Sequence, residues 1–177
     1  MHGTSPGRRQ RRAALWRLGA AALALLVAQQ RAAAQTSAPV TELPRLDDLR
    51  RLTAQARRER VPLLLFFSTP GCPYCLQARR DHLAPLYARG STAGVLIREI
   101  EIVGARTFVD VDGKAVKESS FADRFKVRMV PHVELVDAEL KPLVKPLIGI
   151  DAAGFYGDYL RDAIDTATGL IRARAAP

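Results

Sequence analysis

Cysteine is scarce in this sequence: its 177 residues include only Cys72 and Cys75. Two cysteines are too few for a small scaffold held together by disulfides, so a core of leucine, valine, isoleucine and phenylalanine must hold the fold. They are also too few to complete a tetrahedral metal site, which would need further ligands such as His82 or His132. The closely spaced pair is therefore predicted to do chemistry, and no cofactor or metal is predicted.

The N-terminal region lacks an apolar run long enough to cross a bilayer, which takes about 20 residues. Leu18–Ala28 offers only 11 apolar residues, between an arginine-rich segment that starts at Arg8 and the small residues Ala32-Ala33-Ala34. This three-part pattern predicts a secretory signal peptide over residues 1–34, cleaved near Ala34, and hence a periplasmic protein. An uncleaved anchor stays open as the alternative, and so does the export route.

Acidic residues are absent from residues 1–34, which contain six arginines. Cleavage would lower the basic residues from 27 to 27 − 6 = 21 against 18 acidic ones, so the net charge falls from +9 to +3. The charge therefore does not predict a nucleic-acid partner, and no stable membrane insertion is expected after cleavage. The remaining chain is predicted to form a flexible leader (35–45), one domain (46–169) and a C-terminal tail (170–177).

Hydrophobic periodicity predicts helix, strand, helix and strand in the first half of the domain. The helix spans Leu46–Arg60, and the near-continuous apolar run Val61–Phe67 indicates a strand buried on both faces. The next helix runs from Cys72 to Leu83, where Pro85 should break or kink it around the preceding residue. Val95–Ile102 is the second strand, which a right-handed crossover should place parallel to the first.

The second half is predicted to hold a hairpin, a short helix, two antiparallel strands and a closing helix, at residues 107–116, 119–125, 132–136, 143–150 and 151–168. Ser119 or Ser120 is the expected cap of the short helix. Asp151 is the expected cap of the closing helix, and Gly169 its expected stop.

The closing helix is predicted to bury an apolar stripe of Phe155, Tyr159, Leu160 and Ile164. The element order is a β-α-β half followed by an α-β-β-α half around one sheet. It predicts an α/β fold of thioredoxin-like topology. In this predicted fold, helices should flank a central mixed β-sheet, and the C-x-x-C pair should open the helix after the central strand.

The position of the cysteines at a helix start determines their predicted chemistry. Cys72 lies at or near the N-cap, where free backbone N–H groups and the helix dipole favour its thiolate. We predict Cys72 as the nucleophile and Cys75, one turn deeper, as the thiol that resolves a mixed disulfide. Pro73 fits the first turn, where its missing N–H costs nothing. A structural disulfide that is never turned over, and metal binding, remain the alternatives.

A second predicted feature is the Val130-Pro131 step at the start of a core strand. Proline is unusual there, and a cis bond would explain it, with a trans proline that opens the strand as the alternative. A cis bond would leave the backbone of Val130 free to pair with an extended substrate. Tyr74 should be exposed beside Cys72, so Tyr74, Val130 and Pro131 are the predicted substrate-binding residues.

Three stretches carry a family resemblance: FFSTPGCPYC, VRMVP before a core strand, and LIGIDAAGFYGDYL as strand, glycine turn and last helix. They resemble the thioredoxin superfamily and, within it, the periplasmic thioredoxin-like thiol-disulfide oxidoreductases. The resemblance implies a cis bond at Pro131, with Cys72 as the attacking thiol and Cys75 as the resolving thiol. It implies thiol- or disulfide-bearing periplasmic proteins as partners, and a membrane or periplasmic electron donor or acceptor.

The sequence departs from that family at the dipeptide between the cysteines and at the position six residues before Cys72. Pro73-Tyr74 resembles glutaredoxins, yet residues 148–151 read Ile-Gly-Ile-Asp and lack their glutathione-binding turn. Thioredoxins resemble one another in a buried aspartate six residues before the first cysteine, where this chain has Phe66. Glu99 and Glu134 are the candidate replacements for that proton acceptor.

The two histidines of the predicted domain are less informative. His82 lies near Arg79 and Arg80 in the cysteine helix and is predicted to face solvent, whereas His132 is predicted to be structural. Taken together, the sequence predicts an exported thiol-disulfide oxidoreductase. A non-catalytic partner-binding module and a copper-handling thiol protein are the alternatives, and the direction of electron flow stays open.

Overall fold

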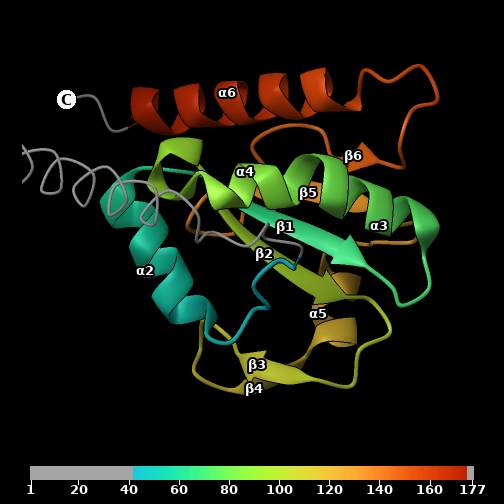
Figure 1. Cartoon of the computed structure of the whole chain (residues 1–177). Coiled ribbons are helices and arrows are strands. Elements are labelled where there is room, and N and C mark those ends of the chain that lie inside the picture. The colour runs from blue at the N-terminus through green and yellow to red at the C-terminus, as the bar shows by residue number, and fades with distance from the viewer. Residues whose placement is uncertain (1–41, 175–177) are drawn as a thin grey trace, which may run out of the picture. The chain divides into compact units, whose positions relative to one another are not determined.

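A four-stranded sheet forms the centre of the computed structural model, which describes residues 42–174 (Figure 1). The predicted signal peptide and most of the predicted leader lie outside the described residues. The strand order is β2 (Leu96–Glu101), β1 (Leu63–Ser68), β5 (His132–Val136) and β6 (Leu147–Ile148). Strand β1 runs parallel to β2 and antiparallel to β5, which is antiparallel to β6. The predicted mixed sheet and α/β fold class are confirmed.

Strand β1 is buried along its whole length and supplies both cores. Because successive side chains point to opposite faces, Leu64 and Phe66 enter one cluster, whereas Leu63, Leu65 and Phe67 enter the other. Two groups of helices cover these faces (Figure 1). The first face is covered by α3 (Pro73–Ala78), α4 (Ala84–Ala88) and α6 (Tyr156–Arg174), and the second by α2 (Leu49–Glu59) and α5 (Glu118–Arg124).

Helix α2 starts three residues later than predicted because Asp48 caps it. The Asp48 carboxylate accepts the backbone N–H groups of Arg50 and Arg51. A side-chain hydrogen bond from Arg50 lowers the pKa of Asp48 well below its usual range. The carboxylate therefore holds the first turn of α2 over the whole neutral pH range.

The folded domain begins before the predicted boundary at residue 46. Leu43 is 5% exposed and belongs to the first core cluster. The Glu99 N–H donates to the Pro44 carbonyl at 2.9 Å, and Arg45 forms a parallel bridge with Glu99. Residues 43–45, predicted as leader, therefore extend the sheet beyond β2.

The helix that follows the cysteines is not broken at Ala84, but it changes its geometry directly before that residue, so the break is absent and the predicted irregularity is present. A π-helical turn, η1 (Arg79–Leu83), joins α3 directly to α4. The Ala84 N–H donates to the Arg79 carbonyl five residues back. This wider turn accommodates Pro85, which has no N–H and whose ring would clash with a carbonyl of a regular α-helix.

The predicted hairpin is confirmed, but the predicted caps of the following helix are not. Strands β3 (Thr107–Val109) and β4 (Ala115–Lys117) pair antiparallel. Helix α5 then starts at Glu118, with Lys117 at the N-cap position and no side-chain cap bond, so neither Ser119 nor Ser120 caps it. The first turn is anchored by the fully buried Glu118, which pairs with Arg45.

The last two elements are shifted from their predicted ranges. Strand β6 has only two residues, because Pro146 directly before it has no N–H to donate to a continuous ladder. Asp151 is not the N-cap of α6: its carboxylate accepts the Phe155 N–H in the preceding turn, and the helix begins at Tyr156.

Helix α6 continues through Gly169 to Arg174, so the predicted stop is wrong and the predicted tail starts inside the helix. A glycine inside a helix costs only about 1 kcal/mol, which the buried residues of α6 before it outweigh. Those residues are Tyr156, Leu160, Ile164, Ala167 and Thr168. Phe155 and Tyr159, predicted to lie on the buried stripe, are instead exposed.

The difference in burial between Phe121 and Phe155 gives a test of the core. Phe121 is fully buried and packs against the rings of Phe67, Phe108 and Phe125. Phe121→Ala is expected to lower the free energy of unfolding by about 3–5 kcal/mol. The matched Phe155→Ala is expected to change it by about 0.5 kcal/mol or less. Urea unfolding of both variants measures the two values, and a large loss for Phe155→Ala would contradict the exposed position.

Candidate active site

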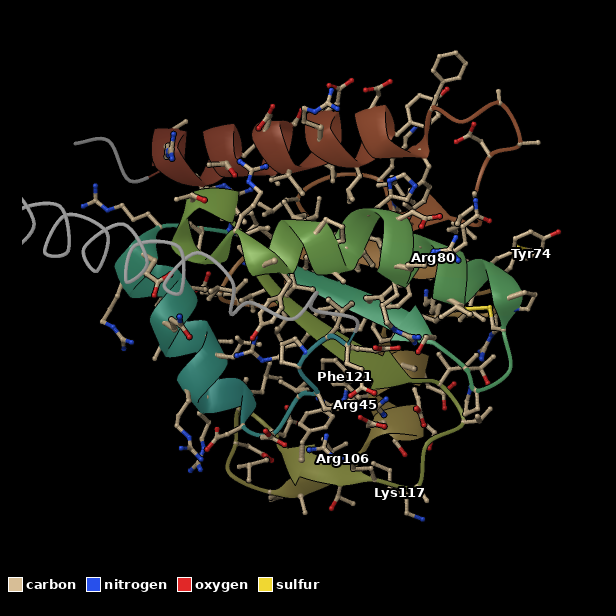
Figure 2. The ribbon with its side chains drawn as sticks, viewed as in Figure 1. Arg45, Tyr74, Arg80, Arg106, Lys117 and Phe121 are labelled. Atoms are coloured by element: carbon tan, nitrogen blue, oxygen red, sulfur yellow. A yellow bond between two sulfur atoms is a disulfide. The ribbon has the colours of Figure 1, made fainter. Side chains whose placement is uncertain are left out.

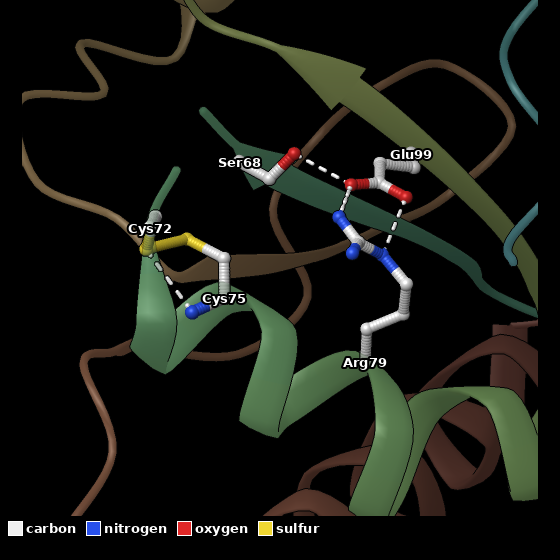
Figure 3. The surroundings of a disulfide bond; sticks show 5 residues. All are labelled: Ser68, Cys72, Cys75, Arg79 and Glu99. Carbon is white, nitrogen blue, oxygen red and sulfur yellow. Dashed lines mark hydrogen bonds and ion pairs between the residues drawn. A yellow bond between two sulfur atoms is a disulfide. The ribbon is translucent and has the colours of Figure 1, made fainter. Parts of the chain in front are cut away.

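Cys72 and Cys75 form a disulfide at the point where the chain leaves the sheet and enters a helix (Figure 3). Strand β1 ends at Ser68, and the turn that follows contains Gly71 with a φ of 75°, a left-handed conformation that glycine adopts without strain. Cys72 is the N-cap residue of α3, and Pro73 occupies the first turn. The two Cα atoms lie 5.2 Å apart.

The sulfur of Cys72 already takes the role of a capping acceptor. The Cys75 N–H donates to Cys72 Sγ at 3.0 Å. A thiolate at the same position would accept this N–H more strongly and would face the positive end of the helix. The local backbone therefore favours the thiolate form of Cys72 after reduction.

The two cysteines differ sharply in exposure. Cys75 is 1% exposed and belongs to the core cluster that contains Phe66, whereas Cys72 is half-buried and packs on the edge of that cluster. An incoming partner can reach only Cys72. Cys75 lies behind it, where it can attack a disulfide made by Cys72.

The predicted substrate-binding residues lie around the same end of the sheet. Tyr74 is 61% exposed and points outward from the start of α3 (Figure 2). The Val130–Pro131 peptide bond is cis, and Val130 is half-buried against both core clusters. His132, which follows, pairs with Phe67 of β1, next to the strand end that leads to Cys72. Tyr74, Val130 and Pro131 therefore lie at the edge of the sheet where β1 ends and β5 begins, which is also where the loop with the cysteines starts.

The two candidate proton acceptors lie on opposite faces of the sheet. Glu99 pairs with Phe66 across β1 and β2, and its side chain accepts hydrogen bonds from Ser68 and Arg79 on the cysteine face (Figure 3). Glu134 points to the other face, where its carboxylate lies 2.9 Å from His132 Nε2. Only Glu99 is therefore placed on the side of Cys75.

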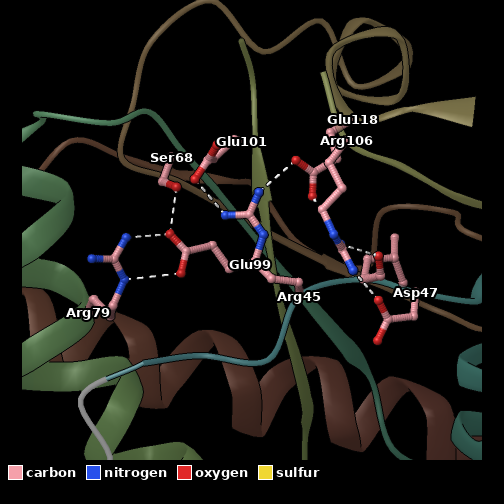
Figure 4. A network of polar contacts seen from close by, with 9 residues as sticks. Arg45, Asp47, Ser68, Arg79, Glu99, Glu101, Arg106 and Glu118 are labelled. Carbon is pink, nitrogen blue, oxygen red and sulfur yellow. Dashed lines mark hydrogen bonds and ion pairs between the residues drawn. The ribbon is translucent and has the colours of Figure 1, made fainter. Parts of the chain in front are cut away.

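A second group of charges continues from Glu99 along the same strand (Figure 4). Arg45 donates to Glu101 at 2.7 Å and to Glu118 at 2.6 Å. Arg106 also lies 3.5 Å from Glu118 and pairs with Asp47. These contacts join the start of the domain, the end of β2 and the start of α5.

His82, predicted to face solvent, is half-buried, because its ring packs against the start of α6. The ring centroids of His82 and Tyr156 lie 5.0 Å apart, and a Cβ atom at Gly157 would come within 3.2 Å of His82. Burial raises the pKa of Tyr156 to about 12, so its hydroxyl stays protonated at neutral pH. His132 is buried with its ring edge-on to Phe67.

A hollow of about 370 Å³ opens beside the disulfide, lined by residues 68–73, Leu76, Arg79 and Glu101. Another hollow, of about 810 Å³, lies between α4 and α6 and includes neither cysteine. Among residues 42–174, no cluster of three or more histidine, cysteine or acidic side chains is arranged to hold a metal ion. In the same range, no helix combines the length and apolar character needed to span a membrane.

Residues 49–145 match the family model of a thioredoxin-like domain, which covers more than half of the chain. The chain belongs to the thioredoxin-like family. The fold is accordingly a thioredoxin fold with its C-x-x-C disulfide at the start of the helix after the central strand. No curated protein matches the chain.

Solved structures with a related fold include several oxidoreductases. A DsbH oxidoreductase has 17% identity and a TM-score of 0.49, and the alignment covers 74% of this chain and 91% of that one. Oxidized mitochondrial thioredoxin 3 from Saccharomyces cerevisiae has 18% identity and a TM-score of 0.47, over 72% and 98% of the two chains. A mutant thioredoxin from Halobacterium salinarum NRC-1 has 19% identity and a TM-score of 0.45, over 75% and 96%.

The unequal exposure of the cysteines gives a direct test in this thioredoxin-like domain. After full reduction, a limiting amount of iodoacetamide is expected to label Cys72 at least about tenfold faster than Cys75, because only Cys72 is accessible and capped as a thiolate. Peptide mass spectrometry measures both rates. Slow labelling of Cys75 should persist in Cys72→Ser, and equal rates for the two thiols would contradict the structure.

Proposed function

We propose that this thioredoxin-like protein is an exported thiol-disulfide oxidoreductase that exchanges its Cys72–Cys75 pair with protein substrates. One observation carries the proposal: the half-buried Cys72 sulfur caps the helix and accepts the Cys75 N–H, while Cys75 is fully buried behind it. A reactive outer thiol and a shielded inner thiol are what exchange through a mixed disulfide requires.

In the direction of substrate reduction, the Cys72 thiolate attacks one sulfur of a substrate disulfide. A mixed disulfide forms, and the other substrate sulfur leaves as a thiolate. Cys75 then loses its proton and attacks Cys72 Sγ, which releases the second substrate thiolate and closes the Cys72–Cys75 disulfide. Two electrons pass to the substrate, whose two sulfurs take up protons. The reverse sequence would oxidise a dithiol.

Substrate chains would reach the disulfide across the surface formed by Tyr74 and Val130-Pro131. Tyr74 offers an exposed aromatic ring, and its neighbour Leu76 is also exposed on α3. Backbone groups near Val130 would pair with an extended substrate segment, which fits a protein rather than a small molecule. The proposed partners are therefore thiol- or disulfide-bearing proteins, with a membrane or periplasmic protein as electron donor or acceptor.

Cysteine variants test the exchange. Cys75→Ser is expected to accumulate mixed disulfides with substrate proteins, because the resolving thiol is absent, and these should disappear on treatment with dithiothreitol. Cys72→Ser is the matched control and should trap nothing and lose insulin reduction. Full activity of Cys72→Ser would overturn the proposal. Undiminished partner binding by Cys72→Ser, with no trapped species from Cys75→Ser, would instead indicate a binding module.

The periplasmic location rests on the sequence pattern of residues 1–34, outside the described part of the structure. When the full chain is produced in a bacterial host, the protein recovered from the periplasm is expected to begin within a few residues after Ala34. N-terminal sequencing of that fraction measures the cleavage point. Recovery of an intact chain starting at Met1 from the membrane fraction would support an uncleaved anchor and contradict the prediction.

A further inference from the structure

A largely buried ion pair joins the helix that carries the disulfide to strand β2 (Figure 3). Glu99 is 4% exposed, and its carboxylate accepts the Ser68 hydroxyl at 2.6 Å and Arg79 Nε at 3.0 Å. A second guanidinium nitrogen of Arg79 also contacts Glu99, so the pair is bidentate. A carboxylate this deeply buried is stable only beside a cation, so neither partner can be removed without leaving the other unbalanced.

Arg79 lies on the cysteine side of this pair. It follows Cys75 by one helical turn, on the same face of the helix, and its backbone N–H donates to the Cys75 carbonyl. Its guanidinium carbon lies 6.0 Å from the ring centroid of Phe66, which shares the core cluster with Cys75. Arg79 also lines the hollow of about 370 Å³ that Cys72 lines.

These positions place the Arg79 cation at the hollow that Cys72 also lines, and the Glu99 carboxylate beside it on the cysteine face of the sheet. The side chains of Arg79 and Glu99 are 22% and 5% exposed, so solvent screens their fields weakly. A thiolate forms here only when the disulfide is reduced. Each charge therefore acts on the reduced state and leaves the neutral disulfide almost unaffected.

We propose that the Arg79–Glu99 ion pair sets the reduction potential of the Cys72–Cys75 couple, with Arg79 stabilising the reduced thiolate and Glu99 limiting that effect. This inference rests on the proposed exchange function and adds two positioning residues to it. Reduction of the disulfide takes two electrons and one proton when one thiol is left ionised. Stabilising that thiolate favours the reduced form and makes the couple more oxidising.

If this proposal is correct, the two single substitutions should shift the reduction potential of the Cys72–Cys75 couple in opposite directions. Glu99→Gln keeps the shape but leaves the Arg79 charge unbalanced, which should favour reduction. Arg79→Gln leaves the Glu99 charge unbalanced, which should disfavour it. The double variant has lost both charges and should return toward the wild-type value. If the ion pair only held β2 and η1 together, all three variants would lose stability and the reduction potential would stay unchanged.

Equilibration of the full mature protein with reduced and oxidised glutathione measures the effect. Glu99→Gln is expected to raise the ratio of reduced to oxidised protein by about fivefold, or about 20 mV, and Arg79→Gln to lower it by a similar factor. The double variant should lie within about twofold of wild type. Arg79→Lys, which keeps the positive charge, should also remain within about twofold.

Arg80→Gln is the matched control. Arg80 is the next residue in the chain and carries the same charge, but its side chain is 66% exposed and pairs with Asp81. Its removal is expected to change the ratio by less than about twofold, because solvent screens it. Circular dichroism checks that each variant is folded. If Glu99→Gln does not fold, the ratio of reduced to oxidised protein is compared between Arg79→Gln and Arg79→Lys, and only Arg79→Gln should lower it.

The outcomes separate this inference from the proposed function. Wild-type protein that does not exchange with glutathione would overturn the proposed function. Wild-type protein that exchanges, with folded Arg79→Gln and Glu99→Gln shifted in the same direction or by less than about twofold, would overturn only the role of the ion pair. Opposite shifts that cancel in the double variant would support it.

Discussion

Burial of strand β1 on both faces is the constraint on which the rest of the structure depends. The strand separates two cores, and its neighbours β2 and β5 are aligned by pairing with it. Its last residue, Ser68, leads into the turn that presents Cys72 at the start of a helix packed on the first core. The position of the reactive sulfur therefore depends on apolar packing several residues away as well as on the hydrogen bond that Cys72 accepts from the Cys75 N–H.

Strand β2 adds a second constraint, because it carries acidic side chains into the domain. Glu99 is matched by Arg79 from the cysteine helix, and Glu101 by Arg45 from the start of the domain. An ion pair with a buried partner such as Glu99 contributes little net stability, whereas loss of its cation costs several kcal/mol. These pairs therefore favour the fold in which the cysteine helix, β2 and the segment around Arg45 lie next to one another.

The sequence was most informative where local pattern decides the structure. The apolar run of β1, the hydrophobic pattern of β2 and the C-x-x-C spacing are each contained within a few residues, and these two strands, their parallel pairing and the position of the cysteines are confirmed. Boundaries set by tertiary contacts were missed. Gly169 continues a helix that its buried neighbours stabilise, and Glu118, not a serine, anchors α5. Arg79 and Glu99 were named singly, but their pairing depends on two elements that meet only after folding.

The contacts made by residues 43–45 limit how far the domain tolerates proteolytic trimming. A new N-terminus at or before Leu43 retains the described contacts of that segment with β2 and α5. Trimming past Arg45 would strip the nearest cation from Glu118, which has no solvent exposure, and leave Arg106 at 3.5 Å as its remaining partner. Any maturation of the chain must therefore stop upstream of this segment, and a fusion partner at the N-terminus needs its linker there as well.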